Sequence, residues 1–576
     1  METRCDVSDI GLDFVDTAGS NREAFLTWVK GVRDLVAIDL ETTGLQPWGP
    51  NADTIRLWSF GTANQGWAVA HRPTAEEALR LLNGIPKTNW NSKFDESFLI
   101  ASGLPDNGPW HDGMIAHHLL YSHKPHSLKS AASTEYGREI KVAQAWLNGV
   151  KRQNRWDWKT VPVDHPAYWS YGALDTVIAF RLSEDLIPEA RRLYREAYDR
   201  ERKIACHYRR MEQRGLSIDV EYSMQLIAEW SSDLGSLRRS IHSLAGIENP
   251  SSRLQLADFL LDQGWEPDEF TETGQPSTNK AVMGKLAKEG FSSHLIQDVL
   301  DYKRKLKYIN TYLVPFAESG GLVNFNLRPM GAKTGRSSVS NPPLQQLPKG
   351  PEIRRCVLAE EGHTLYAADF TAQEMRLICA FAGDPSLTES ILTGADIHGR
   401  VAEAAFGPEW TKEQRGYSKN ALYARLYGAQ PARIARTLGV STEVAMTVLD
   451  AMNRELPGLA GLMERIEQTC ELRAKQGEPY LNTIGGRRIV IDKKHASLNF
   501  LVQGSAADIT KMAVLRAFQQ GIGEWILLPI HDELLISVEQ GQDASRILEA
   551  MEYTILGVPM VAHLSQGGQS WGEICG

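Results

Sequence analysis

The sequence contains no apolar run of about 18 residues, the length that a helix needs to cross a membrane, which excludes a membrane-spanning protein. It has only six cysteines, widely scattered and never in a Cys-x-x-Cys pair. This spacing argues against a disulfide framework or a zinc site and predicts reduced, mostly buried thiols. Residues 1–14 show no basic segment followed by an apolar one, so we expect no secretory signal and a cytoplasmic location.

An excess of positive charge is also missing. The chain carries 62 Lys and Arg against 71 Asp and Glu, a formal net charge of −9. Proteins that coat nucleic acid non-specifically are basic, so the total argues against that class. Hydrophobic residues make up 42% and charged residues 23%, which excludes a disordered chain. The 576 residues are enough for roughly three or four globular domains.

Hydrophobic periodicity divides the chain into an α/β first part and a mostly helical remainder. A long charged helix over Ile187–Arg214 is expected to connect the two parts, and residues 373–475 are expected to form a helical block. The predicted fold class is therefore α/β multidomain. The expected strands are Leu35–Leu40, Ile55–Thr62, Leu365–Phe370, Trp525–Ile530 and Leu534–Val538.

A first group of acidic residues lies in the α/β part. Asp39 and Glu41 are two positions apart at the end of an expected strand, so both side chains leave the same face. Tyr171 and Asp175 are four positions apart on an expected helix and also share a face. Asp95 lies on another expected helix. Carboxylates that converge can bind divalent metal ions, although each of these patterns alone is common in proteins without that function.

A second group lies in the remainder of the chain. Asp369 ends an expected strand, and Glu374 follows as a helix begins. His531, Asp532 and Glu533 form a polar tip between two apolar strands. Taken alone, such a tip is typical of an ordinary hairpin turn.

One expected helix carries a cation or an aromatic ring at every fourth position, namely Arg415, Lys419, Tyr423 and Tyr427. At about 100° per residue, these side chains wind slowly across one broad face of the helix. Two cations followed by two rings suit a triphosphate at one end and a stacking base at the other. A basic helix that packs its tyrosines into a core is the alternative for this helix by itself.

In order, the first group reads D-x-E, D and Y-x-x-x-D over about 140 residues. This order resembles the proofreading 3′–5′ exonucleases of the DEDDy type, which have an RNase H-like fold. The resemblance implies that two metal ions carry out an in-line displacement, with Tyr171 orienting the attacking water. The residues that it assigns to the metal ions are Asp39, Glu41, Asp95 and Asp175.

The second group resembles motifs A, B and C of family A DNA polymerases, the DNA polymerase I group. The segments DFTAQEMR, RGYSKNALYARLYG and HDE occur in that order. Lys333–Pro348, Asp396-Ile397-His398 and Asn499–Asp508 resemble further segments of that family. The likeness runs from about residue 30 to the C-terminus. It implies template-directed DNA synthesis from dNTPs on a primer–template.

The resemblance implies a role for each matching acid. Asp369 and Asp532 would hold two Mg²⁺ ions, with Mn²⁺ able to substitute. Glu533 would be an auxiliary acid near the primer terminus, and Glu374 would fill the space that a ribose 2′-hydroxyl needs. The residues implied to contact DNA are Arg336, Asn499, Gln503 and His531.

The resemblance also implies how a nucleotide would be held. Arg415, Lys419 and His398 would grip the triphosphate, with Lys419 as the proton donor to pyrophosphate. Tyr427 would close against the nascent base pair. Tyr423 stands where many relatives have Phe, which predicts ready incorporation of dideoxynucleotides. The other departures from the family pattern are Ala372, Gln373 and His495.

The implied architecture is an exonuclease domain followed by a right-hand polymerase, expected to be a monomer. We expect the exonuclease over 1–190, a connecting helix over 191–215, the thumb over 216–320, the palm over 321–380 and 476–576, and the fingers over 381–475. A short chain of this kind without a 5′-nuclease domain is typical of phage replication enzymes. Processivity partners are not predictable from the sequence.

Two other functions compete with this interpretation. One is an RNase D-like 3′–5′ exonuclease with an inactive polymerase-like region, against which the intact Asp369, Asp532 and Lys419 argue. The other is a non-enzymatic DNA clamp, against which two sets of metal-type carboxylates argue.

The charge distribution revises the first impression of an acidic protein. Residues 301–360 carry ten Lys and Arg against four acidic residues, a local excess of six positive charges. This stretch joins the expected thumb to the palm, where a duplex phosphate backbone would lie. The net charge therefore conceals a predicted basic DNA track.

Overall fold

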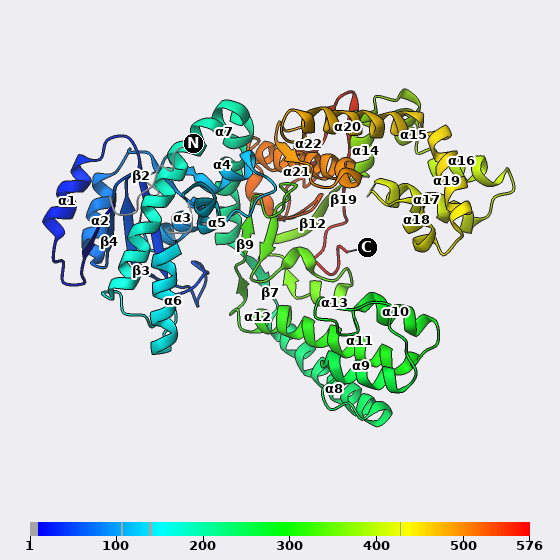
Figure 1. Ribbon diagram of the computed structural model, residues 1–576, viewed down its shortest axis with the longest axis horizontal. Helices are drawn as coiled ribbons and strands as arrows, with labels where there is room; N and C mark the ends of the chain where they lie inside the picture. The colour runs from blue at the N-terminus through cyan, green and yellow to red at the C-terminus, as the bar shows by residue number, and fades with distance from the viewer. Residues whose placement is uncertain (1–9, 105–107, 137–140, 427, 576) are drawn as a thin grey trace. The chain divides into compact units, whose positions relative to one another are not determined.

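The computed structural model describes residues 10–104, 108–136, 141–426 and 428–575 (Figure 1). The predicted nucleotide-binding residue Tyr427 and the thiol of Cys5 lie outside the described residues. The mixture of helices and strands confirms the α/β fold class. In the described ranges, no helix is long and apolar enough to cross a membrane.

The chain divides into two compact units, each assembled from distant segments of sequence. The first unit comprises residues 1–214, 326–339 and 366–565. The second comprises residues 215–325, 340–365 and 566–576. The two groups of predicted site residues all belong to the first unit.

The first unit begins with a six-stranded mixed sheet in the order β1-β4-β3-β2-β5-β6. Strand β2 pairs parallel with β5 and antiparallel with β3. The strands predicted at Leu35–Leu40 and Ile55–Thr62 are β2 and β3, so both predictions are confirmed. The six strands are β1 (Gly11–Val15), β2 (Val36–Thr42), β3 (Ile55–Gly61), β4 (Gln65–Val69), β5 (Lys87–Asn89) and β6 (Trp110–Asp112).

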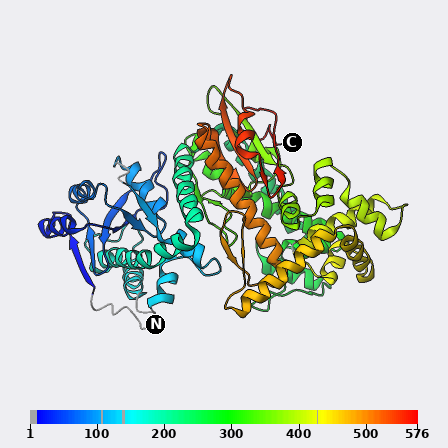
Figure 2. The same ribbon diagram turned by 90° about the horizontal axis from the view of Figure 1, so that it is seen from above.

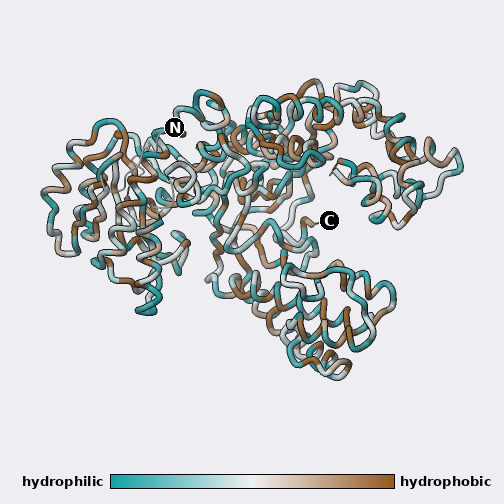
Figure 3. Tube along the Cα trace, in the orientation of Figure 1, coloured by the Kyte–Doolittle hydropathy of each residue, from teal (hydrophilic) through white to brown (hydrophobic). Residues whose placement is uncertain are grey.

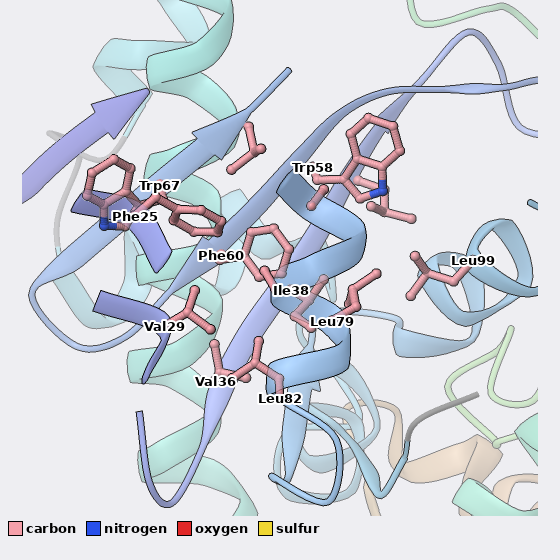
Figure 4. Packing of buried hydrophobic residues seen from close by; sticks show 14 of the residues in the cluster. Phe25, Val29, Val36, Ile38, Trp58, Phe60, Trp67, Leu79, Leu82 and Leu99 are labelled. Carbon is pink, nitrogen blue, oxygen red and sulfur yellow. The ribbon is translucent and has the colours of Figure 1, made fainter. Parts of the chain in front are cut away.

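Helices α1 (Arg22–Gly31) and α2 (Arg72–Leu81) pack their apolar sides on this sheet (Figure 4). The ring of Phe25 lies 5.3 Å from that of Phe60 and 5.4 Å from that of Trp67, between ring centres. Such aromatic contacts add to the hydrophobic stabilisation of the buried area. This core fixes β2, the strand that carries Asp39 and Glu41.

Helix α7 (Pro166–Arg214) also crosses the sheet and carries Tyr171 and Asp175. The backbone of α7 comes close to β4, because a Cβ atom at Gly66 would lie 2.3 Å from the Ala173 carbonyl oxygen. The sequence predicts separate helical segments on either side of residue 187. The structure instead has one helix of 49 residues with a kink at Tyr194, where φ is −139° and ψ is 41°.

Four further helices complete the N-terminal part of the first unit. Among them, α5 contributes the buried side chains of Ala131 and Ala132 to a second apolar cluster shared with α7. The four are α3 (Ser92–Ala101), α4 (Gly113–Leu120), α5 (Leu128–Tyr136) and α6 (Val142–Asn154).

A four-stranded sheet in the order β15-β16-β12-β19 forms the centre of the C-terminal part of the first unit. Helices α14 (Gln373–Ala382) and α21 (Ser497–Gln519) contact each other beside it, and α21 is the long orange helix of Figure 2. The three strands predicted here are confirmed. The sheet consists of β12 (His363–Phe370), β15 (Ile526–Ile530), β16 (Glu533–Glu539) and β19 (Ala562–Leu564).

The helical block predicted over residues 373–475 is confirmed. Helix α17 (Lys412–Leu426) contacts α16, α18 and α19. The other helices of the block are α15 (Pro385–Thr393), α16 (Ile397–Phe406), α18 (Pro431–Leu438), α19 (Thr442–Glu455) and α20 (Pro457–Lys475). The remaining elements of the first unit are β9 (Asn326–Arg328), β10 (Ser338–Ser340), β13 (Tyr480–Asn482), β14 (Arg488–Val490), α22 (Arg546–Met551), β17 (Tyr553–Ile555) and β18 (Val558–Met560).

The second unit is built mainly from helices around an apolar cluster that includes Ile241, Leu260 and Ile296. Hydrophobic and hydrophilic residues alternate along these helices (Figure 3), the pattern of amphipathic helices. A three-stranded sheet has the order β11-β7-β8. The elements are β7 (Leu216–Ile218), α8 (Val220–Ala245), α9 (Arg253–Asp262), α10 (Lys280–Lys288), α11 (Ser293–Tyr308), α12 (Val314–Ala317), β8 (Leu322–Val323), α13 (Pro351–Arg354) and β11 (Val357–Leu358).

Candidate active sites

The acids of the second group come together because of the strand order in the four-stranded sheet. Asp369 is the next-to-last residue of β12, and His531 and Asp532 form the two-residue turn between β15 and β16. Since β16 is the neighbour of β12, this turn lies beside the end of β12. The N–H of Phe370 donates to the carbonyl oxygen of Asp532 at 3.2 Å. The predicted hairpin tip and strand end are therefore parts of one site.

Two residues beside these acids have positive φ although neither is glycine. The φ angle is 60° at His531 and 51° at Ala372. A side chain in this left-handed region costs roughly 1–2 kcal/mol, and such strain clusters at functional sites. The bend at His531 orients Asp532, and the bend at Ala372 orients the first turn of α14, which carries Glu374.

The electrostatics of this site favour a bound cation. Partial loss of hydration and the carboxylates of Asp532 and Glu533 raise the pKa of Asp369 to about 7. Like charges this close repel one another, and a cation between them relieves the repulsion. Asp369 reaches solvent while its neighbours Ala368 and Phe370 are buried, so the carboxylate faces outward for a ligand.

Several residues predicted to contact DNA lie around the same site. Arg336 pairs with Glu374 at 2.7 Å between Nη2 and Oε1. Burial and the charge of Arg336 lower the pKa of His531, which keeps its imidazole neutral at pH 7. Asn499 and Gln503 are one turn apart on α21 and both half-buried.

A buried network that the sequence does not predict holds the loop before Arg336. Arg487 donates to the carbonyl oxygen of Thr334 at 2.9 Å, and Lys511 donates to that of Gly335 at 2.8 Å. Asp508 compensates the charge of Arg487, with 2.5 Å between Oδ1 and Nε. Gly335 has a φ of 77°, and a Cβ atom there would collide with the guanidinium of Arg487. Buried contacts of Arg487 and Lys511 therefore anchor the backbone of the loop before Arg336.

The cations predicted to bind a triphosphate form a second cluster in the helical block. Arg415 on α17 pairs with Asp396 through two hydrogen bonds, of 2.7 and 2.8 Å. Asp396 also caps α16, where its side chain accepts from the N–H of Gly399 at 3.0 Å. The rings of His398 and Tyr423 lie 6.4 Å apart. Lys419, on the same helix as Arg415, is exposed.

Part of the positive charge predicted over residues 301–360 is balanced locally. Four of its cations form ion pairs within their own unit, so the DNA track stays a prediction. The pairs are Arg304–Asp301, Lys305–Asp233, Lys333–Asp492 and Arg336–Glu374.

The acids of the first group are brought together by the parallel pair β2 and β5. Asn89, at the end of β5, donates to Asp39 Oδ1 at 3.1 Å and also to a carboxylate oxygen of Asp95. Asp95 in turn accepts from the N–H of Leu40 at 3.0 Å. Burial raises the pKa of Asp39 to about 6, and burial together with the Asp39 charge raises that of Glu41 to about 8.

The prediction that Tyr171 and Asp175 lie on one helix is confirmed. Tyr171 and Asp175 lie on α7, which packs on β2 and β3. Burial and the charges of Glu41 and Asp39 raise the pKa of the Tyr171 hydroxyl, which stays protonated and can donate a hydrogen bond. Asp175 forms an ion pair with Lys129.

Two residues of this site are missed by sequence reasoning. Asn89 bridges two predicted acids, and Lys129 contacts a third. The signal for Asn89 is its place at the end of a short strand parallel to the one that carries Asp39. The sequence holds no signal for Lys129, because its partner Asp175 is 46 positions away.

Both groups consist of carboxylates, the donor type that hard divalent cations prefer. Within the described ranges, no three His, Cys, Asp or Glu side chains converge closely enough to hold a metal ion. Burial raises the pKa of Asp369, Asp39 and Glu41, and neighbouring carboxylates raise those of Asp369 and Glu41 further. The donor chemistry of both groups therefore fits divalent ions, whose charge would draw the carboxylates together.

Comparison with known proteins decides the family. A family model described as "DNA polymerase family A" matches residues 220–573. The chain belongs to DNA polymerase family A. This polymerase is 27% identical over 595 aligned positions to the DNA polymerase of Mycobacterium phage D29, with 96% of each chain covered. It is 28% identical to that of Mycobacterium phage L5, again over 96% of each chain.

Bacterial relatives are longer than this polymerase. It is 30% identical to DNA polymerase I of Chloroflexus aurantiacus over 85% of this chain and 55% of that protein. A solved structure described as the POL domain of Pol1 from M. smegmatis, in complex with DNA primer-template and dNTP, has the same fold. Its TM-score is 0.75 at 23% identity, covering 98% of this chain and 100% of that one. Family A polymerases are metal-dependent, in agreement with the acidic sites.

Proposed function

We propose that this polymerase extends a DNA primer along a DNA template from dNTPs and removes mismatched 3′ ends at a separate site. The observation that carries the first activity is the hairpin turn with Asp532, hydrogen-bonded to the end of the strand with Asp369. The M. smegmatis polymerase domain was solved with primer-template and dNTP, which supports the same ligands for this chain.

The acids of the palm form the synthesis site. Asp369 and Asp532 would hold two Mg²⁺ ions, or Mn²⁺ in their place, and these would supply charge that favours ionisation of the primer 3′-hydroxyl and neutralises the triphosphate. Glu533 adds negative charge beside the primer terminus. Glu374 fills the space next to the sugar and so selects against a ribose 2′-hydroxyl.

The cluster on α16 and α17 binds the incoming nucleotide. Arg415, Lys419 and His398 contact the triphosphate, and the ion pair with Asp396 keeps the Arg415 guanidinium oriented. A bond forms between the primer O3′ and the α-phosphorus as the 3′-hydroxyl proton passes to water, and the bond from that phosphorus to the β-phosphate oxygen breaks. Lys419 donates the proton to the leaving pyrophosphate. Tyr427 closes against the new base pair.

The end of the duplex is held from the minor groove. Arg336, Asn499 and Gln503 donate to purine N3 and pyrimidine O2, acceptors that every correct pair presents there. His531 contacts the primer terminus beside them. The buried contacts of Arg487 support this function because they hold the loop that presents Arg336.

The domain roles follow the same assignment. We assign residues 1–190 to the exonuclease, 216–320 to the thumb and 381–475 to the fingers, with the palm formed by 321–380 and 476–576. The two phage relatives of similar length support a role in phage DNA replication, which would take place in the host cytoplasm.

The synthesis proposal is tested by primer extension with purified protein, Mg²⁺ and dNTPs. The Asp369→Asn variant should lose extension by about 10³-fold, because it removes charge stabilisation needed in the transition state. Asp543→Asn, which changes an exposed aspartate of the same unit, is the matched control. Extension by Asp369→Asn at the rate of the control would refute the assignment.

The excision proposal rests on the acids gathered by β2, β5 and α7. Asp39, Glu41, Asp95 and Asp175 would hold two divalent ions, which would supply the charge that activates a water and stabilises the leaving 3′-oxygen. Tyr171 orients the attacking water through its hydroxyl. The bridge that Asn89 makes between Asp39 and Asp95 supports a prearranged site.

Excision is tested on a single-stranded DNA labelled at its 5′ end, with Mg²⁺ and without dNTPs. The parent should shorten the strand from its 3′ end, and the Asp39→Asn/Glu41→Gln variant should not. Asp34→Asn, an exposed residue just before β2, should behave as the parent. A parent that leaves the strand intact would refute this activity.

A further inference from the structure

A lysine side chain stands among the acids of the excision site. Lys129 Nζ forms an ion pair with Asp175, and Asp39 and Glu41 attract the same ammonium. The ammonium also lies 4.8 Å from the centre of the Tyr171 ring. Only 11% of the Lys129 side chain is exposed, whereas lysines are almost never buried unless paired. The ammonium therefore lies beside Asp175 and Tyr171, within range of the charges of Asp39 and Glu41.

The lysine is placed there by the anchoring of its helix. Ser127 accepts from the N–H of Ser130 at 3.2 Å, as a serine that caps the start of α5. One residue earlier, the carbonyl oxygen of His126 accepts from the indole N–H of Trp90 at 2.7 Å. Trp90 directly follows Asn89, the residue that bridges two of the acids. The same segment thus positions the acids and the helix of the lysine.

The charges of the lysine and the acids compensate each other in the protein without metal. Lys129 Nζ is ion-paired with Asp175, and both side chains are largely buried, with 11% and 7% of their surfaces exposed. A buried charge is tolerated only with a partner of opposite sign. The acids need a cation for the same reason, and Lys129 supplies one from the chain itself.

We propose that Lys129 is a built-in cation of the excision site, which holds Asp175 while the site has no divalent ion and competes with such an ion for that carboxylate. The inference rests on the proposed excision function, because that function requires a divalent ion at Asp175. A divalent ion has to displace the ammonium in order to use this ligand. Lys129 therefore weakens the affinity of the site for divalent ions.

The test measures binding of Mn²⁺ by electron paramagnetic resonance, independently of activity. All proteins carry Asp369→Asn and Asp532→Asn, which weaken ion binding at the synthesis site. The Mn²⁺ binding that is lost when Asp39→Asn and Glu41→Gln are added is assigned to the excision site. Lys129→Met removes the charge with little change in length, Lys129→Arg keeps the charge, and Lys124→Met is the matched control. Lys124 lies over the Tyr121 ring, 4.1 Å from its centre.

Lys129→Met should bind Mn²⁺ about tenfold more tightly at the excision site, a factor that corresponds to ~1.4 kcal/mol. Lys129→Arg and Lys124→Met should bind it as the parent does. Equal affinity in Lys129→Met and the parent, or weaker binding in Lys129→Met, would overturn the proposal. Circular dichroism verifies folding, and Lys129→Gln provides a second neutral side chain if the Met variant does not fold.

Thermal melting provides a second readout. In EDTA, Lys129→Met should melt at a lower temperature than the parent, because the carboxylates of the excision site then lack a cation. Added Mg²⁺ should reduce this difference in melting temperature. The same loss in EDTA and in Mg²⁺ would contradict the proposal. A parent that binds Mn²⁺ at Asp39 and Glu41 but excises no DNA would refute the excision function alone, and the competition would still stand.

Discussion

Arg336 and Glu374 form an ion pair, with 2.7 Å between Nη2 and Oε1, although the resemblance assigns them to different ligands. Arg336 is predicted to hold the primer terminus and Glu374 to exclude a ribose hydroxyl. Each side chain is about one-third exposed, with 31% and 32% of its surface accessible. Such a pair contributes little to stability, about 0–1 kcal/mol. We propose that its importance is positional, because the pair orients the predicted primer contact, Arg336, and the predicted sugar filter, Glu374, relative to each other.

Glu374→Ala should weaken the choice of deoxynucleotides. The shorter side chain leaves room for the 2′-hydroxyl and releases Arg336 from its partner. The ratio of kcat/KM for a dNTP over the matching rNTP should fall by about tenfold or more. Single-nucleotide incorporation measures this ratio, and Glu389→Ala, an exposed acid on α15, is the control. An unchanged ratio would contradict the role of Glu374 as a steric gate.

Tyr423→Phe should reduce termination by dideoxynucleotides. The hydroxyl of Tyr423 can replace the contact that the missing sugar 3′-hydroxyl would make, and Phe cannot. Tyr423 is 44% exposed, so its hydroxyl is open to a ligand. Tyr417→Phe is the matched control, because Tyr417 lies on the same helix and its hydroxyl donates to Glu413 at 2.7 Å. Equal termination by the parent and Tyr423→Phe would contradict this role.

Arg487→Met should destabilise the first unit strongly. Arg487 is 1% exposed and pairs with Asp508, which is fully buried. Removal of Arg487 leaves Asp508 with Arg200, 3.1 Å away, as its remaining cation, and leaves buried acceptors without their donor, which costs about 3 kcal/mol in the free energy of unfolding. Arg488→Met is the control, since Arg488 pairs with the half-exposed Glu478 and should cost only about 0–1 kcal/mol. Urea denaturation compares the two, and equal losses would show that the network is not critical.

Acid should destabilise the N-terminal part through His117. Burial, followed by the charges of His126 and Lys124, lowers the pKa of His117 to about 3. Below pH 6.5 the unfolded chain binds a proton at this residue that the folded chain does not, so stability falls as the pH falls towards 3. His117→Gln should lose about 2–3 kcal/mol less than the parent between pH 6.5 and 4.5. His123→Gln, at an exposed position, is the control, and identical losses in all three proteins would contradict the prediction.

Local patterns predicted most of the elements that carry the sites. The two-residue spacing of Asp39 and Glu41, the four-residue spacing of Tyr171 and Asp175, and the polar tip at His531 each reflect the geometry of one strand, helix or turn. All three are present in the structure. The junction between helical segments expected near residue 187 lies instead at Tyr194, where a residue with non-helical φ and ψ interrupts α7.

Contacts between distant segments were not predictable in the same way. Arg487 and Lys511 reach a loop more than 150 positions earlier in the chain, and Lys129 reaches Asp175 on another helix. Such pairs depend on how helices and strands pack, which no local spacing encodes. The positive φ at Ala372 is likewise imposed by the junction of β12 and α14 and not by the residue type.

The most direct test of two separate active sites uses one primer with a mismatched 3′ end, a template, Mg²⁺ and dNTPs. The parent should remove the mismatch and then extend the primer. Asp369→Asn or Asp532→Asn should remove it without extension, whereas Asp39→Asn/Glu41→Gln should extend a matched primer but leave the mismatch in place. Loss of both activities in both sets of variants would contradict the assignment of synthesis and excision to separate carboxylate groups.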